Sequence, residues 1–141
     1  MNEQLTPAYW ALRIGLGAAA FLAGLDKFFH VLAEWDMYLS PLVERLVPVG
    51  PEVFLQVVGV VEMVVGAAIL AGAARVFGYV AAAWLLGIAV NLVTTGAFFD
   101  VAVRDVVMAL AAFTLARLAE VRAGAAARDQ AFSRPVSQTV A

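Results

Sequence analysis

Three ionisable residues stand close together near the end of the first apolar stretch of the sequence. Asp26, Lys27 and His30, the only histidine in the chain, lie within the segment AGLDKFFH. Lysine and histidine can donate hydrogen bonds to a carbonyl oxygen, and a titratable side chain can supply a proton when that carbonyl is reduced. This combination favours a site for a neutral ligand with carbonyl oxygens, such as a quinone headgroup, or a site for proton relay.

The elements that must position these groups are long apolar stretches. Of the 141 residues, 64% are apolar and 14% charged, and the mean hydropathy is +0.91. A soluble domain is closer to half apolar and a quarter charged, so we expect the surroundings to be a lipid bilayer. About 20 apolar residues of helix cross a bilayer core of about 30 Å. The stretches that meet this length are residues 8–32, 53–74, 76–99 and 101–118.

These stretches predict an all-α integral membrane protein, in which residues 1–122 form a four-helix bundle. The connections at residues 72–75 and 94–100 are short, and short connections require antiparallel neighbours. Gly15, Ala19 and Ala23 recur every four residues and are typical of helices that pack closely in lipid. Residues 123–141 lose the apolar periodicity and predict a mobile tail.

The connection between the first two apolar stretches is longer than the others. A set of large apolar side chains shares one helical face there: Leu32, Trp35, Leu39, Leu42 and Leu46. We therefore expect residues 33–46 to be an interfacial segment that lies across one mouth of the bundle. It would serve there either as a functional lid or only as a loop that rests on the lipid headgroups.

The arginines predict the orientation of the chain in the membrane. With four spans, both termini and the turn at residues 72–75 lie on the same side. That side carries most of the arginines: Arg75, Arg117, Arg122, Arg128 and Arg134. Positive residues favour the cytoplasmic side. We expect a multi-pass membrane protein with both termini in the cytoplasm.

Each predicted helix also contributes polar residues to the outer half of the bundle. From the helical rise of 1.5 Å per residue, Lys27 and Asp105 are expected within about 10 Å of the outer surface, and Glu62 about 12–14 Å deep. Charged groups at such depth turn inward to find partners. We expect a polar pocket formed by Asp26, Lys27, His30, Glu62, Asn91, Arg104 and Asp105.

The charges in this pocket limit its ligands. Acidic residues outnumber Lys27 and Arg104, which disfavours an anion, and one histidine without any cysteine leaves no ligand spacing typical of a metal site. The net charge of −2 excludes a nucleic acid partner. A plain alternative is that the charges only hold the helices in register, as the ion pairs Lys27–Asp26 and Arg104–Asp105 and a hydrogen-bonded pair of Asn91 and Glu62. If the polar residues converge in a pocket, the expected partner of Arg104 is Asp26.

The order of the apolar stretches and their polar interruptions resembles the DoxX-like family of small four-helix bacterial membrane proteins. The resemblance covers nearly all of the chain except the tail, over LRIGLGAAAFLAGLDKFFH, then VGVVEMVVGAAILAGAARVFGYVAAAWLLGIAVN, then GAFFDVAVRDVVMALAAFTLARL. The family is similar to the DoxD subunit of thiosulfate:quinone oxidoreductase, which implies a role in membrane redox complexes and a quinone as cofactor. Arg13, Lys27, Glu62 and the pair Arg104–Asp105 match the polar positions of the family. The resemblance implies no catalytic residue.

Two functional hypotheses follow from the sequence. The first is a quinone-linked redox or accessory subunit, and the second is a non-catalytic scaffold or assembly subunit of a larger membrane complex. A small transporter is less favoured because no proline interrupts a span. The expected partners are the lipid bilayer and either further copies of the chain or other subunits. The sequence leaves open whether the protein is an enzyme.

Overall fold

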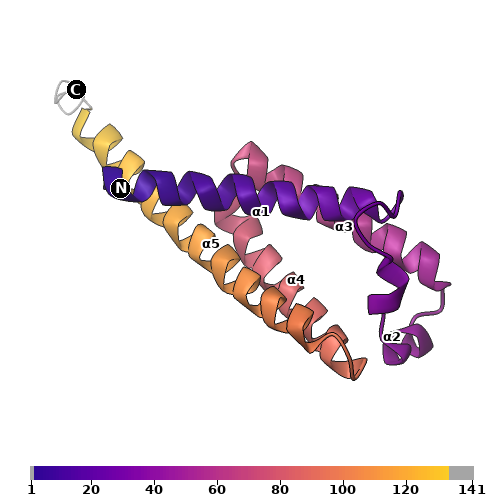
Figure 1. The fold of residues 1–141 in the computed structure, drawn as a ribbon. Helices are drawn as coiled ribbons and strands as arrows, with labels where there is room; N and C mark the ends of the chain where they lie inside the picture. The colour runs from indigo at the N-terminus through magenta and orange to yellow at the C-terminus, as the bar shows by residue number, and fades with distance from the viewer. Residues whose placement is uncertain (1, 134–141) are drawn as a thin grey trace.

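The computed structural model describes residues 2–133, which form helices and short turns without any strand (Figure 1). A short 3-10 helix at Glu3–Leu5 leads into the first long helix. The long helices are α1 (Thr6–Asp26), α3 (Pro51–Ala71), α4 (Ala74–Thr94) and α5 (Phe99–Ser133). Between α1 and α3 lie a single 3-10 turn, η2 (Trp35–Tyr38), and a short helix, α2 (Pro41–Leu46). The all-α fold class is confirmed.

Three segments of the described chain are long and apolar enough to cross a membrane. They are Glu3–Asp26, Pro51–Ala71 and Ala74–Thr94. Helix α5 is not among them, because Arg104, Asp105 and Arg117 interrupt its apolar stretch. The structure thus agrees with three of the four predicted spans in length and composition, whereas the fourth span and the insertion into a membrane stay predictions.

The long helices are arranged as two pairs. Helix α1 packs mainly against α3, and α4 packs mainly against α5, with fewer contacts between the pairs. Figure 1 shows the pairs closest together at the end that holds the N-terminus and diverging toward the end that holds α2. We call these the N-terminal end and the α2 end. A core around Tyr9, Ile69 and Leu115 joins the pairs near the N-terminal end.

Glycines set the close packing of α1 against α3. A Cβ added to Gly66 would lie 2.5 Å from the backbone nitrogen of Phe21 and 2.6 Å from the carbonyl oxygen of Gly17. Gly24 and Gly59 face each other in the same way two helical turns further along. Gly15 is not part of this contact face, because nothing within the chain lies within 4 Å of a Cβ added there. The contact face repeats every seven residues rather than every four.

Helix α1 ends earlier than the sequence predicted. It stops at Asp26 instead of continuing to residue 32. The Asp26 carboxylate accepts hydrogen bonds from three backbone amides, those of Val31, Leu32 and Ala33, and so pulls the following chain back over the helix end. His30 has a φ of 55° in this turn, a conformation that a continuing helix does not allow.

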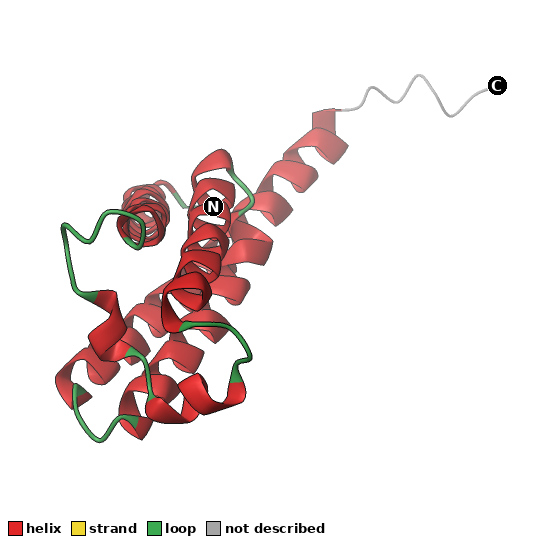
Figure 2. Cartoon of the chain, turned by 90° about the vertical axis from the view of Figure 1, so that its right-hand side faces the viewer, coloured by secondary structure: helices red, strands yellow, loops and turns green. Residues whose placement is uncertain are grey.

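Helix α5 runs further than predicted. Residues 123–133 of the predicted tail continue α5 to Ser133 and extend beyond the packed helices (Figure 2), whereas the mobility of this segment stays a prediction. Alanine has the highest helix propensity of all residues, and the segment AGAAARDQAF contains five of them. The helix therefore needs no packed face there. Residues 134–141, the remainder of the predicted tail, lie outside the described residues.

The segment predicted at residues 33–46 folds as η2 and α2 rather than as one amphipathic stretch. Leu32, Leu42 and Leu46 are exposed, whereas Trp35 and Leu39 are partly buried. Tyr38, also partly buried, packs against Phe98, which directly precedes α5. The apolar stripe is therefore divided between the protein and its surroundings, and a position on the membrane surface stays a prediction.

Candidate functional site

A buried ion pair joins α1 to α3 at the α2 end. Lys27 Nζ lies 2.5 Å from Glu62 Oε2, and the two side chains are only 5% and 9% exposed. Gly59 makes the approach possible, because the stem of Lys27 passes directly over it and a Cβ at that position would be 3.1 Å from Lys27 Cβ. The sequence predicted both residues as site members without identifying them as a pair.

The indole ring of Trp35 covers the other side of this lysine. Lys27 Nζ lies 3.8 Å from the centre of the ring, within the range of a cation–π contact. Trp35 was not among the predicted site residues. Its place in the apolar stripe pointed to membrane anchoring, and no spacing rule connects a tryptophan in a loop to a lysine eight residues earlier.

Asp26 positions this tryptophan. Its Oδ2 accepts a hydrogen bond of 2.9 Å from Trp35 Nε1, in addition to the bonds from the backbone amides that end α1. The carboxylate is buried and fully engaged within the protein. The expectation that Asp26 pairs with Arg104 is therefore wrong, and its role is to hold the turn and the ring that cover Lys27.

Asp105 of α5 completes the charged group. It is partly buried and lies within electrostatic range of both Glu62 and Lys27. One cation and two carboxylates from three helices thus face one another where the helix pairs diverge. The excess of acid agrees with the sequence-based argument against an anionic ligand at this end.

Arg104 and His30 lie outside the group. The Arg104 side chain is 75% exposed, and its nearest acidic partner is Asp100 at 3.9 Å. Adjacent helical residues differ in direction by about 100°, so Arg104 turns outward when Asp105 faces inward. His30 is exposed in the turn after α1. Its expected position on the same face as Asp26 required a helix that has already ended.

Asn91 connects α4 to the segment between η2 and α2. Its Oδ1 accepts a hydrogen bond of 3.0 Å from the Ser40 amide, and its Nδ2 donates one of 2.7 Å to the Tyr38 carbonyl oxygen. Thr94 Oγ1 donates to the fully buried Ser40 hydroxyl at 2.9 Å. The alternative in which Asn91 bonds to Glu62 is wrong, because both ends of its amide are used by this segment.

Replacing Asn91 with alanine should release this segment. The change leaves the Ser40 amide and the Tyr38 carbonyl without partners, and an unsatisfied buried polar group costs about 1–3 kcal/mol. We expect hydrogen–deuterium exchange at the Ser40 amide to become at least about ten-fold faster, which corresponds to the lower part of that range. Thr114→Val is the control, since Thr114 bonds only within α5. Unchanged exchange at Ser40 in Asn91→Ala would contradict this role.

Aromatic rings line the same end of the molecule. Trp35 and Tyr38 lie 6.3 Å apart between ring centres, and Tyr38 and Phe98 lie 4.8 Å apart at a steep angle. These rings begin directly over Lys27 and continue to the start of α5. The rings therefore form an aromatic cluster that extends from Lys27 to the start of α5. Within residues 2–133, no three His, Asp or Glu side chains are grouped closely enough to hold a metal ion.

Comparison of the chain with known proteins gives no further information about the ligand of this site. No family model, no curated protein and no solved structure matches it. The interpretation of the site therefore depends on the geometry of Lys27, Glu62, Asp105 and Trp35.

Proposed function

We propose that this chain is a DoxX-like integral membrane protein that binds a quinone headgroup at its α2 end, as a redox or accessory subunit of a larger complex. The observation that carries the proposal is the buried Lys27–Glu62 pair covered by Trp35, with Asp105 facing it. Buried charges in an apolar helical protein are costly and mark functional sites more often than exposed charges do.

The proposed topology has four spans, with residues 101–118 of α5 as the fourth. Both termini lie in the cytoplasm of a bacterial inner membrane, and the α2 end faces outward. The arginines support this orientation, because Arg75 and Arg122 lie at the same end of the molecule as the start of α1. Arg45 in α2 and Arg104 are the arginines at the other end.

The chemistry follows from the three charged groups. The Lys27 ammonium has three N–H donors, so it can bond Glu62 and still donate to a carbonyl oxygen of the headgroup. Reduction of a quinone to a hydroquinone takes two electrons and two protons. The Lys27 ammonium and Asp105 in its acid form are the candidate donors of the two protons, the Glu62 carboxylate holds the ammonium in place, and a partner subunit supplies the electrons.

A non-catalytic scaffold is the second candidate, and a specific observation favours it. Asp26, Asn91 and Ser40 satisfy their hydrogen bonds inside the protein, as expected of groups that only hold segments together. In this interpretation, the Lys27–Glu62 pair locks α1 onto α3 and binds no ligand.

Quinone binding can be measured through the fluorescence of Trp35. The chain has three tryptophans, so Trp10→Phe/Trp84→Phe leaves Trp35 as the only reporter. Trp84 suits this change because its buried Nε1 has no hydrogen-bond partner among the described residues. We expect a short-chain ubiquinone to quench Trp35 saturably in detergent. In Lys27→Met/Glu62→Leu on this background, binding should weaken about 10–100-fold, the effect of losing one charge-assisted hydrogen bond.

Arg104→Gln is the matched control, because it removes an exposed charge at the same end. It should bind the quinone as the parent does. Thermal unfolding of each variant distinguishes lost binding from lost structure. Quenching that rises linearly with quinone concentration in the Trp35-only parent, in Lys27→Met/Glu62→Leu and in Arg104→Gln would rule out the redox proposal. The scaffold would then be the remaining candidate function.

A further inference from the structure

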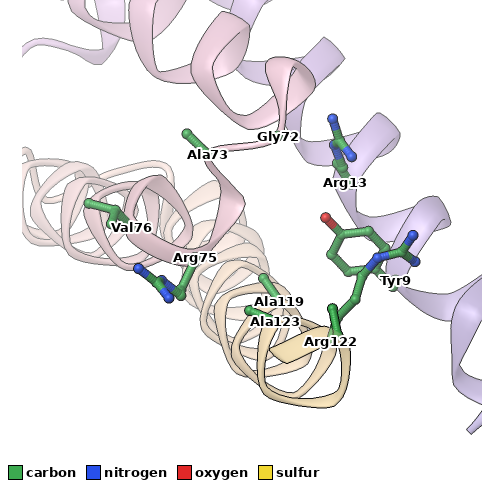
Figure 3. Close-up of a pocket in the computed structure, with 10 residues that line it drawn as sticks. Tyr9, Arg13, Gly72, Ala73, Arg75, Val76, Ala119, Arg122 and Ala123 are labelled. Carbon is green, nitrogen blue, oxygen red and sulfur yellow. The ribbon is translucent and has the colours of Figure 1, made fainter. Parts of the chain in front are cut away.

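A pocket in the described part of the chain lies at the N-terminal end, opposite the proposed quinone site. It has a volume of about 510 Å³, and three separate parts of the chain form its walls (Figure 3). Helix α1 contributes Tyr9 and Arg13, the first turn of α4 contributes Arg75, and α5 contributes Arg122. The sequence assigned Arg75 and Arg122 only to membrane orientation.

The pocket is strongly cationic. Its ten lining residues include three arginines and no acidic residue. Within residues 2–133, none of the ion pairs involves Arg13, Arg75 or Arg122. The positive charge at this end is therefore not neutralised by the protein residues that the structure describes.

Arg13 is held in place by the end of α3. Its Nε donates to the Ile69 carbonyl oxygen at 3.0 Å, and its Nη2 donates to the Leu70 carbonyl oxygen at 2.6 Å. Gly72 ends α3 with a φ of 112° directly beside this guanidinium. A guanidinium has five N–H donors, so donors of Arg13 remain for a ligand after both carbonyl oxygens are satisfied.

Arg122 is held by stacking rather than by hydrogen bonds. Its guanidinium carbon lies 5.0 Å from the centre of the buried Tyr9 ring, and that of Arg13 lies 4.7 Å from the Trp10 ring. Figure 3 shows Arg13, Tyr9 and Arg122 on one side of the pocket and Arg75 on the other. Two guanidinium groups are therefore positioned side by side before any ligand arrives.

We infer that this pocket binds a phosphate group. Planar guanidinium groups bind phosphate oxygens in a bidentate manner, and positioned arginines lose little freedom when they do so. In the proposed topology, the pocket opens at the level of the cytoplasmic headgroups, where tyrosine and tryptophan side chains also concentrate. The phosphate comes either from the headgroup of an anionic phospholipid or from a soluble phosphate.

Native mass spectrometry of the detergent-solubilised protein can test the site with phosphatidylglycerol as the probe and phosphatidylcholine as the reference lipid. We expect saturable binding of phosphatidylglycerol to the parent protein. Each arginine near a membrane surface strengthens the binding of anionic lipid about five-fold, so Arg75→Gln/Arg122→Gln should weaken it about 25-fold. Both side chains are exposed and cap no helix, so the variant should fold.

Arg104→Gln/Arg128→Gln is the matched control. It removes the same charge from exposed positions outside the pocket and should bind phosphatidylglycerol as the parent does. Displacement of the lipid by millimolar inorganic phosphate would assign the site to a soluble phosphate, and retention of the lipid would assign it to a headgroup. Equal losses in the two double variants, or equal binding of phosphatidylcholine and phosphatidylglycerol by the parent, would overturn the site.

Discussion

Lys27→Met should destabilise the protein by about 3–5 kcal/mol, because removing one partner of a buried ion pair leaves the other charge without compensation. The stranded group is Glu62, whose side chain is only 9% exposed. Methionine keeps the length of the lysine stem and its packing over Gly59. The loss of stability therefore reflects the missing charge rather than a cavity. Unfolding in detergent micelles, followed by circular dichroism against denaturant, measures the change.

Lys27→Met/Glu62→Leu is the control for this prediction. Replacing both partners of a buried pair with apolar residues of similar size is often nearly neutral. We therefore expect the double variant to recover most of the stability that the single variant loses. A double variant as unstable as Lys27→Met would mean that the lysine contributes through other contacts, of which its cation–π contact with Trp35 is the first to consider.

Gly66→Ala should separate α1 from α3. The new methyl group would lie 2.5 Å from the Phe21 nitrogen and 2.6 Å from the Gly17 oxygen, and these backbone atoms cannot move without shifting the whole helix. Overpacking of a core commonly costs about 1–3 kcal/mol, and we expect a loss of about 3 kcal/mol because backbone meets backbone here. The same unfolding measurement in detergent applies.

Gly15→Ala provides the comparison on the opposing helix. Nothing lies within 4 Å of a Cβ added at Gly15, so the change adds only the helix propensity of alanine. Alanine is more favourable than glycine by up to about 1 kcal/mol in a helix interior. Gly15→Ala should therefore be neutral or stabilising. Equal losses at the two glycines would contradict the packing of α1 against α3 described above.

Apolar periodicity was enough to predict the long helices and which charged residues of different helices lie at similar levels along them. Lys27, Glu62 and Asp105 were expected at similar levels in different helices, and the structure does place them near one another. Their partners were harder to predict. The direction in which each helix faces depends on Gly17, Gly24, Gly59 and Gly66, and a repeat of seven is easily hidden among other small residues.

The remaining site residues depend on a turn that periodicity cannot describe. Asp26 looked like one member of a helical charge pattern, yet its carboxylate ends the helix and holds Trp35 over Lys27. His30 was expected on the face of a helix that stops four residues before it. Hydrogen bonds from a side chain to nearby amides compete with the helix, and a hydrophobicity pattern carries no information about them.

The arginine pocket was missed for a different reason. Arg13, Arg75 and Arg122 are far apart in the sequence, and each had a sufficient explanation by itself. Only the packing of α1, α5 and the first turn of α4 brings them to one place. Their type and number predicted a side of the membrane, which stays a prediction, but not that they converge in one pocket.

The separation of Lys27 from Glu62 in the chain has a consequence for biosynthesis. The partners are 35 residues apart, so α1 is complete well before Glu62 is made. At about 5–20 residues per second, the delay is roughly 2–7 seconds. Helix α4, by contrast, meets α5 across a short turn as soon as both exist. In a chain that inserts into the membrane as it is made, Lys27 at the end of α1 therefore has no ion-pair partner for seconds. Quality-control factors that recognise unpaired lysines could act on α1 only within that interval.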